Sequence, residues 1–252
     1  MILSKKHKFL FIKTRKTAGT SIEIALSKIC GQNDIITPIT PIDERLRFHA
    51  TGRICQNYSN NRSLEKIYRK TIIGDQDLPI KIPNEVLSQQ MFYNHMPISE
   101  VFLKTSYNCK NYFKFTVERH PYDKAISLAN YRMIYEQYSS GITTEININN
   151  IPPIIDHLIK SGRMEMCLNS HKMYSINGKP MVNKILRFEN ISKELNDLLK
   201  LIGVAEKIDL PFTKVGIRNK NVPASDILTL DQKIYIQNIC RAEFNLMSYE
   251  AQ

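Results

Sequence analysis

An apolar run that leads directly into a loop of small polar residues is the strongest constraint on what this 252-residue chain can fold into. Residues 8–13 are aromatic and aliphatic between two lysines, which predicts a buried strand. Residues 14–21 read Thr-Arg-Lys-Thr-Ala-Gly-Thr-Ser, and from Ser21 apolar residues recur at helical spacing as far as Gly31. A buried strand followed by a loop and a helix is typical of α/β domains.

The rest of the chain continues this alternation. Further strands are predicted at 91–93, 112–117 and 181–188, and further helices at 97–104, from 121 onward, at 192–203 and at 229–240. The last helix begins with the capping box Thr229-Leu-Asp-Gln232. Residues 32–90, which four prolines interrupt, are predicted to be an insertion with short helices. We therefore expect one α/β domain over 1–252, with a central parallel sheet flanked by helices.

Charge and cysteine content narrow the class of protein. The formal net charge of +11 indicates an anionic partner: nucleic acid, a membrane surface, or a ligand that carries phosphate or sulfate. The five cysteines are widely spaced and form no CxxC pair, so a disulfide framework or a zinc site is disfavoured and the reduced cytosol is favoured. No stretch approaches the roughly 18 apolar residues of a membrane span. A soluble, cytoplasmic protein is expected.

The loop at 14–21 has the properties of a phosphate-binding site. Its amides and the start of the following helix direct positive partial charge at an anion, and Gly19 is expected to let the backbone approach that ligand. Hydroxyls and charges are contributed by Arg15, Lys16, Thr17, Thr20 and Ser21. A Walker A motif would place lysine directly before the Ser or Thr, whereas Lys16 precedes the glycine, so a magnesium-dependent NTPase is disfavoured. An ordinary strand-to-helix turn with a basic flank is the alternative.

A second candidate site follows the strand at 112–117. Arg119 leaves that strand, Pro121 begins a helix, and Ser127 lies eight residues after Arg119, less than two turns into the helix. This spacing allows both side chains to face one ligand. A surface ion pair at Arg119 and a solvated Ser127 are the alternative.

Both motifs resemble those of one family. Lys16-Thr-Ala-Gly-Thr-Ser21 after a strand resembles the 5′-phosphosulfate loop of sulfotransferases that use 3′-phosphoadenosine 5′-phosphosulfate (PAPS). In carbohydrate-type members this loop has the sequence Pro-Lys-Thr-Ala-Gly-Thr-Ser, and this chain has Arg15 in place of the proline. Residues 119–127 resemble the family's 3′-phosphate motif, Arg-x-Pro-Tyr-Asp-Arg-x-x-Ser, with Lys124 in place of its second arginine.

The resemblance implies a P-loop-like sulfotransferase fold, PAPS as co-substrate, 3′-phosphoadenosine 5′-phosphate (PAP) as product, and no metal. It implies that Arg119 and Ser127 hold the 3′-phosphate. The 5′-phosphosulfate would be held by Arg15, Lys16, Thr17, Ala18, Gly19, Thr20 and Ser21. Lys16 would also bridge the leaving oxygen and the sulfuryl group. The acceptor would be a hydroxyl on a carbohydrate, and the insertion at 32–90 would lie on the acceptor side.

Transfer to a hydroxyl requires a base, and a neutral histidine serves near pH 7. His95, just before the helix at 97–104, is similar to the histidine that acts as base in enzymes resembling heparan sulfate 2-O-sulfotransferase. A capping or core histidine is the alternative. His49 and then Glu44 are the next candidates for the base, and His120 is expected to cap a helix.

Two other functions stay open. One is a nucleotide kinase or phosphatase on a related P-loop fold. The other is nucleic-acid binding, which the charge suggests but no recognisable motif supports. Golgi members of the resembling family carry a membrane anchor before the first strand, whereas this strand starts within ten residues of Met1, so a microbial or viral form is expected. Arg218 and Lys220 are candidate late contacts to the 3′-phosphate.

Overall fold

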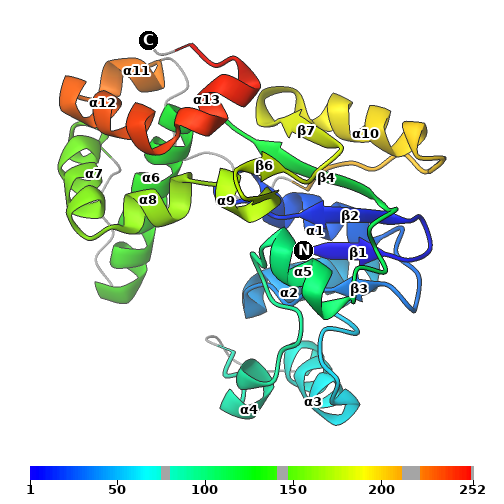
Figure 1. Cartoon of the computed structure of the whole chain (residues 1–252). Coiled ribbons are helices and arrows are strands. Elements are labelled where there is room, and N and C mark those ends of the chain that lie inside the picture. Colours follow the sequence, from blue (N-terminus) through cyan, green and yellow to red (C-terminus); the bar gives the residue numbers. More distant parts are fainter. Residues whose placement is uncertain (75–79, 141–146, 212–221, 251–252) are drawn as a thin grey trace.

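The computed structural model describes residues 1–74, 80–140, 147–211 and 222–250, and its centre is a five-stranded sheet of order β3-β1-β2-β4-β7 (Figure 1). The strands of this sheet are β1 (Ile2–Ser4), β2 (Phe9–Ile12), β3 (Ile35–Ile36), β4 (Phe113–Glu118) and β7 (Lys184–Arg187). A separate ribbon pairs β5 (Ser175–Ile176) with β6 (Lys179–Pro180). Arg218 and Lys220 lie outside the described residues.

The sheet is mixed, which corrects the prediction of a parallel sheet. β2, β4 and β7 are parallel neighbours, whereas β1 runs antiparallel to both β2 and β3. The three-residue β1 is too short to show an alternating pattern, and only its pairing with β2 reveals it. The strand predicted at 91–93 is wrong, because the amides of Met91 and Phe92 donate instead to the carbonyl of Tyr58.

Helices surround the sheet. Those before β4 are α1 (Gly19–Ser27), α2 (Pro41–Thr51), α3 (Arg62–Ile73), α4 (Asn84–Ser88) and α5 (Ile98–Lys104). Those after it are α6 (Pro121–Ser140), α7 (Ile151–Lys160), α8 (Arg163–Leu168), α9 (His171–Tyr174), α10 (Ile191–Leu201), α11 (Ala224–Ile227), α12 (Leu230–Ile239) and α13 (Arg241–Met247). The predicted insertion contains α2, α3 and α4, and it also supplies the edge strand β3.

Most predicted elements are confirmed with small shifts at their ends. α1 begins at Gly19, before the predicted start at Ser21, and α5 begins one residue after Pro97. The capping box is present: the Thr229 hydroxyl accepts from the Gln232 amide, and the Gln232 side chain accepts from the Thr229 amide. Among these three helices, α12 starts at a side-chain cap, whereas α1 and α5 follow Ala18 and Pro97 without one.

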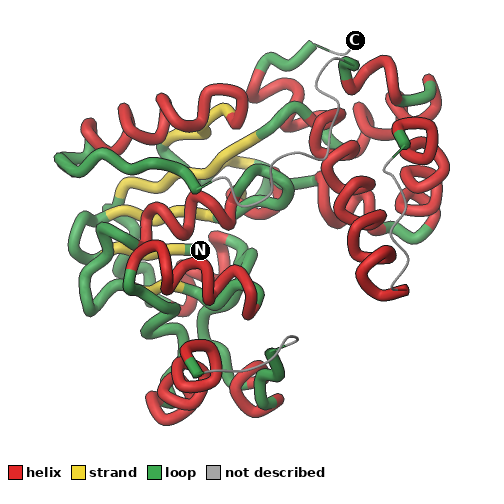
Figure 2. Tube along the Cα trace, turned by 180° about the vertical axis from the view of Figure 1, so that it is seen from behind, coloured by secondary structure: helices red, strands yellow, loops and turns green. Residues whose placement is uncertain are grey.

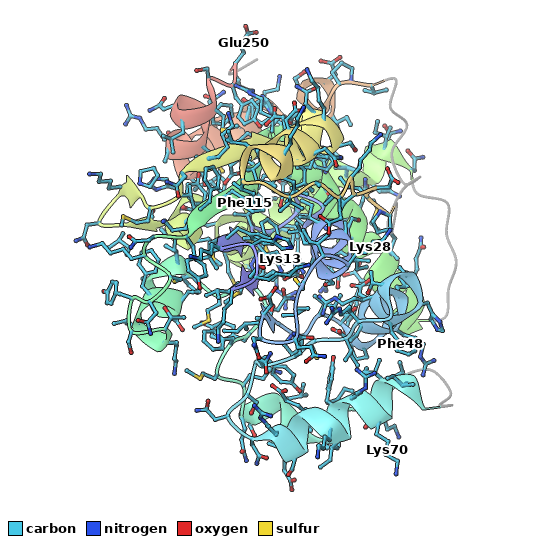
Figure 3. All side chains as sticks on the ribbon, turned by 90° about the vertical axis from the view of Figure 1, so that its right-hand side faces the viewer. Lys13, Lys28, Phe48, Lys70, Phe115 and Glu250 are labelled. Atoms are coloured by element: carbon cyan, nitrogen blue, oxygen red, sulfur yellow. The ribbon has the colours of Figure 1, made fainter. Side chains whose placement is uncertain are left out.

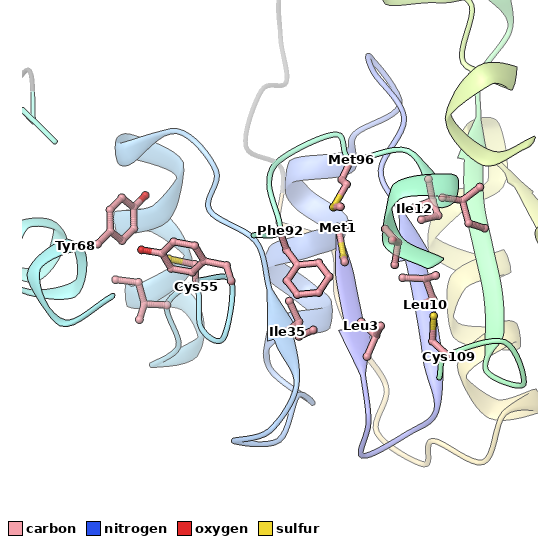
Figure 4. Close-up of a cluster of buried hydrophobic side chains, with 14 of the residues drawn as sticks. Met1, Leu3, Leu10, Ile12, Ile35, Cys55, Tyr68, Phe92, Met96 and Cys109 are labelled. Atoms are coloured by element: carbon pink, nitrogen blue, oxygen red, sulfur yellow. The ribbon is translucent and has the colours of Figure 1, made fainter. Parts of the chain in front are cut away.

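Alternate residues of β2 face opposite sides of the sheet, as the period of a strand requires. Phe9 and Phe11 join the core under α1 and α10, while Leu10 and Ile12 join the core on the other face, beside α5. Figure 4 shows this second core, with Met96 beside the β1–β2 strands. The two faces of the sheet are therefore both covered.

A helical block stands beside the sheet. It packs α6, α7, α8, α11, α12 and α13 around a third apolar core, and Figure 2 shows it at the end of the sheet from behind. α6 leads into this block directly from the end of β4. Within the described part of the chain, no helix combines the length and the apolarity needed to cross a membrane.

Candidate functional site

The candidate site lies at the edge where β2 and β4 end. The two strands are parallel neighbours with Ile12 opposite Thr116, so the loops that follow them leave from the same edge. Side chains tie these loops together: the Thr116 hydroxyl donates to the Ile12 carbonyl at 2.8 Å, and the Thr14 hydroxyl donates to the Val117 carbonyl at 2.5 Å. The two predicted motifs therefore meet in space.

The backbone of the first loop has the shape of an anion-binding turn. Lys16 and Ala18 both adopt left-handed conformations, with φ of 61° and 57°. Ala18 is followed at once by the helical Gly19, and such a change of hand turns successive amides toward one concave side. The first amides of α1 have no acceptor within their own helix, so they are directed at whatever lies before it.

The hydroxyl groups of this loop differ in role. The Thr17 side chain is buried and bonds to the Thr14 hydroxyl at 2.9 Å, so it braces the loop. Only its main chain remains to contribute to a ligand. The Thr20 hydroxyl accepts from the Lys13 ammonium at 3.4 Å. Ser21 lies in the first turn of α1.

Gly19 is also required for a reason that the sequence analysis did not identify. A Cβ at this position would lie 2.6 Å from Cγ of Lys13, which is closer than carbon atoms pack. The Lys13 side chain therefore passes directly against Gly19 on its way under the loop. Lys13 is only 3% exposed, and Figure 3 shows it in the interior of the molecule.

Below the loop, Lys13 is bound to a buried carboxylate that the sequence analysis missed. Its ammonium lies 2.7 Å from Glu23, and the guanidinium of Arg47 lies 3.8 Å from the same carboxylate. Burial alone raises the pKa of Glu23, but the charges of Lys13, the Met1 ammonium and Arg47 together outweigh it and hold that pKa below its usual range. A charged residue among the apolar Ile22, Ile24 and Ala25 is the signal that could have revealed this pair.

The Lys16 side chain lies toward α6. Its ammonium is 4.6 Å from the ring centroid of Tyr131. Burial raises the pKa of the Cys167 thiol on α8, while the charges of Arg15 and Lys16 act to lower it, so both cations lie within electrostatic reach of α8. Arg15 and Lys16 thus form a basic border between the loop and the helical block.

His95 lies against the base of the loop. It has a left-handed backbone, with φ of 58°, and its Nδ1 is 3.1 Å from the Lys13 carbonyl oxygen. Because a carbonyl can only accept, Nδ1 carries the proton and Nε2 keeps its lone pair. Burial, followed by the charges of Lys13 and Arg15, lowers the pKa of His95 to about 3. The imidazole is therefore neutral at pH 7, and a pKa this low makes it a weak base until an anionic donor binds beside it.

Arg119 and Ser127 lie on the β4–α6 side of the edge. The Arg119 guanidinium stacks over the ring of Phe188 at 4.3 Å and lies 4.0 Å from the Asp123 carboxylate. Ser127 is half-buried one turn of α6 beyond Asp123. Arg119, Asp123 and Ser127 follow one another at four-residue spacing, which brings each beside the next along the start of α6.

Lys124 has a structural role. It is fully buried, where it donates to Glu118 at 3.1 Å, to the Leu168 carbonyl at 2.9 Å and to the Ser170 hydroxyl at 2.5 Å. Burial raises the pKa of Glu118 to about 7, although Lys124 opposes the rise. Lys124 therefore joins α6 to the segment between α8 and α9.

The other candidate bases are less well placed. His49 is exposed on α2, and Glu44 is buried with its carboxylate bonded to Arg47. His120 caps α6 as expected: its Nδ1 accepts from the Tyr122 amide at 3.3 Å, and its Nε2 donates to the Glu250 carbonyl at 3.1 Å. Of these four groups, His95 is the one that contacts the loop.

Two further observations concern ligands. A surface cavity of about 740 Å³ lies between the start of α3, residues 89–91 and Lys104, and none of the predicted site residues lines it. Among the residues that the structure describes, no group of three or more His, Cys, Asp or Glu could hold a metal ion.

Comparisons with family models, with curated proteins and with solved structures found no match for this chain.

Proposed function

We propose that this chain is a PAPS-dependent sulfotransferase with a P-loop-like fold, which moves a sulfuryl group onto a carbohydrate hydroxyl. One observation carries the proposal. An anion-binding turn, a half-buried arginine and a histidine with an available Nε2 meet at one strand edge. The carbohydrate-type motifs in the sequence support the same function.

The donor would bind here as a nucleotide with an anionic group at each of two positions. Amides from Ala18 to Ser21, with the Thr20 and Ser21 hydroxyls, would hold the 5′-phosphosulfate. Arg119 and Ser127, on the loop and helix after the adjacent strand, would hold the 3′-phosphate. Neighbouring strands lie about 4.8 Å apart, so both ends of one nucleotide are within reach.

The reaction is an in-line displacement at sulfur. A bond forms between sulfur and the acceptor oxygen while the bond from sulfur to the 5′-phosphate oxygen breaks. The acceptor proton moves to Nε2 of His95, and PAP leaves with the negative charge. Lys16 and the loop amides stabilise that charge as it grows, and interactions that strengthen in the transition state are the ones that accelerate transfer.

The charge of the protein agrees with these ligands. PAPS carries about −4, since a phosphomonoester contributes roughly −1.5 to −2. The net charge of +11 therefore exceeds what the donor needs. The remaining positive charge would attract an acceptor that is itself anionic, such as a polysaccharide with uronic acids or sulfates.

The direct test is transfer of labelled sulfate from PAPS to a panel of neutral and anionic glycans. We expect the parent and His49→Ala to transfer label, and His95→Ala to lose about 10²–10⁴-fold in rate, the range for loss of a general base. All three proteins should bind PAP equally, because His95 acts on the acceptor.

Other outcomes would support the alternatives. Magnesium-dependent turnover of ATP without sulfate transfer would indicate a kinase or phosphatase. An affinity for DNA or RNA above that for PAP at physiological salt would indicate a nucleic-acid-binding protein. A fully active His95→Ala enzyme would contradict the assignment of the base while leaving the donor site intact.

A further inference from the structure

The ring of Tyr131 contacts the lysine that the reaction needs most. Lys16 Nζ lies 4.6 Å from the centroid of this ring, within the roughly 6 Å over which a cation is attracted to an aromatic face. Tyr131 stands one turn beyond Ser127 on α6, and its side chain is 47% exposed. One part of this tyrosine therefore touches the loop while another part reaches solvent.

The ring is held by a rigid helix, whereas the lysine is on a strained loop. Neighbouring residues of α6 are buried in the core of the helical block, among them Ala125, Ile126 and Ala129. Lys16 has a left-handed backbone and a long side chain with four rotatable bonds. Without a fixed neighbour such a side chain samples many rotamers. The entropy lost when it is ordered during binding or catalysis then costs free energy, and a contact that orders it beforehand removes that cost.

A cation that rests on a ring face keeps its N–H groups available on the side away from the ring. The ring has no strong acceptor in its face, so it does not compete with phosphate or sulfuryl oxygens for those donors as a carboxylate would. The Lys13 ammonium, by comparison, is bound to the Glu23 carboxylate. A ring face such as that of Tyr131 therefore orients an ammonium without itself neutralising the charge.

We propose that Tyr131 is a positioning residue that holds Lys16 over the anion-binding turn for sulfuryl transfer, an inference that rests on the proposed function. The phenolic hydroxyl has no part in this role, since the aromatic face makes the contact. Tyr135, one turn further along α6 and 55% exposed, provides a matched control on the same helix.

The kinetic test compares Tyr131→Leu, Tyr131→Phe and Tyr135→Leu with the parent. We expect Tyr131→Leu to lower kcat by about 3- to 30-fold, the factor that a cation–π contact supports. Its Kd for PAP should stay within about two-fold of the parent, because the 3′-phosphate site is unchanged. Tyr131→Phe and Tyr135→Leu should both keep the parental kcat. Equal kcat values for Tyr131→Leu and Tyr131→Phe would overturn the proposal.

A spectroscopic measurement tests the contact without turnover. In the parent, the ε-methylene protons of Lys16 should resonate upfield through the ring current of Tyr131, and they should remain upfield when PAP is added. The shift should persist in Tyr131→Phe and disappear in Tyr131→Leu, with Lys16→Gln identifying the resonance. A normal shift in the parent, or its loss on addition of PAP, would overturn the proposal.

The two levels of the claim fail differently. A parent protein that binds no PAP and transfers no sulfate would refute the proposed function, and the role of Tyr131 would fall with it. A parent that transfers sulfate while Tyr131→Leu does so equally well would refute the role of Tyr131 alone.

Discussion

Two ion pairs lie where the neighbouring strands β2 and β4 end, and they differ in length and in burial. On the β2–α1 side, Lys13 and Glu23 are 2.7 Å apart with side chains only 4% and 0% exposed. On the β4–α6 side, Arg119 and Asp123 are 4.0 Å apart with side chains 17% and 25% exposed. The first pair is closed and supports the loop from below. The second, a loose pair, is longer and more exposed, as the proposed binding of a 3′-phosphate by Arg119 requires.

The difference shows that sequence position alone does not separate a structural cation from a ligand-binding one. Lys13 directly precedes the loop at 14–21, and Lys16 lies in that loop three residues later. Lys13 is buried under Gly19, whereas Lys16 lies over Tyr131 at the border of the site. A buried ion pair is costly to break and gives little when formed, so Lys13 is suited to support and Lys16 to chemistry.

The largest expected effect concerns the pKa of His95, which burial and then the charges of Lys13 and Arg15 lower. With a pKa lowered to about 3, His95 stays neutral from neutral to mildly acidic pH. The pH profile of kcat/KM, which reports the free enzyme, should therefore show no histidine limb near the unperturbed value of ~6.5. In the profile of kcat, which reports the enzyme with its donor bound, the histidine limb should lie at a pH above 3. The negative charge of the bound donor favours the imidazolium and so raises the pKa of His95.

The same shift has a consequence for stability. A folded pKa below the unfolded one means that His95 contributes stability above about pH 6.5, and this contribution is lost as the pH falls toward 3. Urea titrations of the parent and His95→Gln across this range would measure it. A kcat/KM limb at 6.5 that disappears in His95→Ala would contradict the lowered pKa.

The next largest effect is on stability, and it compares removal of the carboxylate from the closed pair with its removal from the loose pair. Glu23→Gln leaves Lys13, Arg47 and the Met1 ammonium without their shared carboxylate, and we expect the free energy of unfolding to fall by about 3–5 kcal/mol. Asp123→Asn, the matched change at the loose pair, should cost less than about 1 kcal/mol. Urea denaturation measures both. Similar losses in the two variants would show that the pairs do not differ.

A smaller effect tests the close approach of Lys13 to the loop. Gly19→Ala places a methyl group 2.6 Å from Cγ of Lys13, whose far end is tied to Glu23, and we expect a loss of about 1–3 kcal/mol. Gly31→Ala is the control, since its nearest neighbour is the Lys6 side chain at 3.4 Å and its φ is not positive. It should be neutral or slightly stabilising. A harmless Gly19→Ala would mean that Lys13 can move aside.

Local patterns predicted much of the fold and the two motifs of the site. The strand at 8–13, the helix from 121 and the capping box at 229–232 are confirmed because their own residues carry the signal. The short strands β1 and β3 were missed because two or three residues have no period, and their pairing comes from distant segments. Glu23 as the partner of Lys13 and Tyr131 as the partner of Lys16 were also missed, because each contact joins the strand or loop to a separate helix.

The most direct test of the account is the difference in affinity between PAP and AMP, measured by calorimetry on the parent and on Arg119→Ala. The two nucleotides differ by the 3′-phosphate that Arg119 would bind. We expect the parent to bind PAP more tightly than AMP by about 1.5–3 kcal/mol, the scale of hydrogen bonds to charged groups. Arg119→Ala should remove most of this difference. Equal affinities for PAP and AMP in the parent would contradict the donor site and with it the assignment of the loose pair.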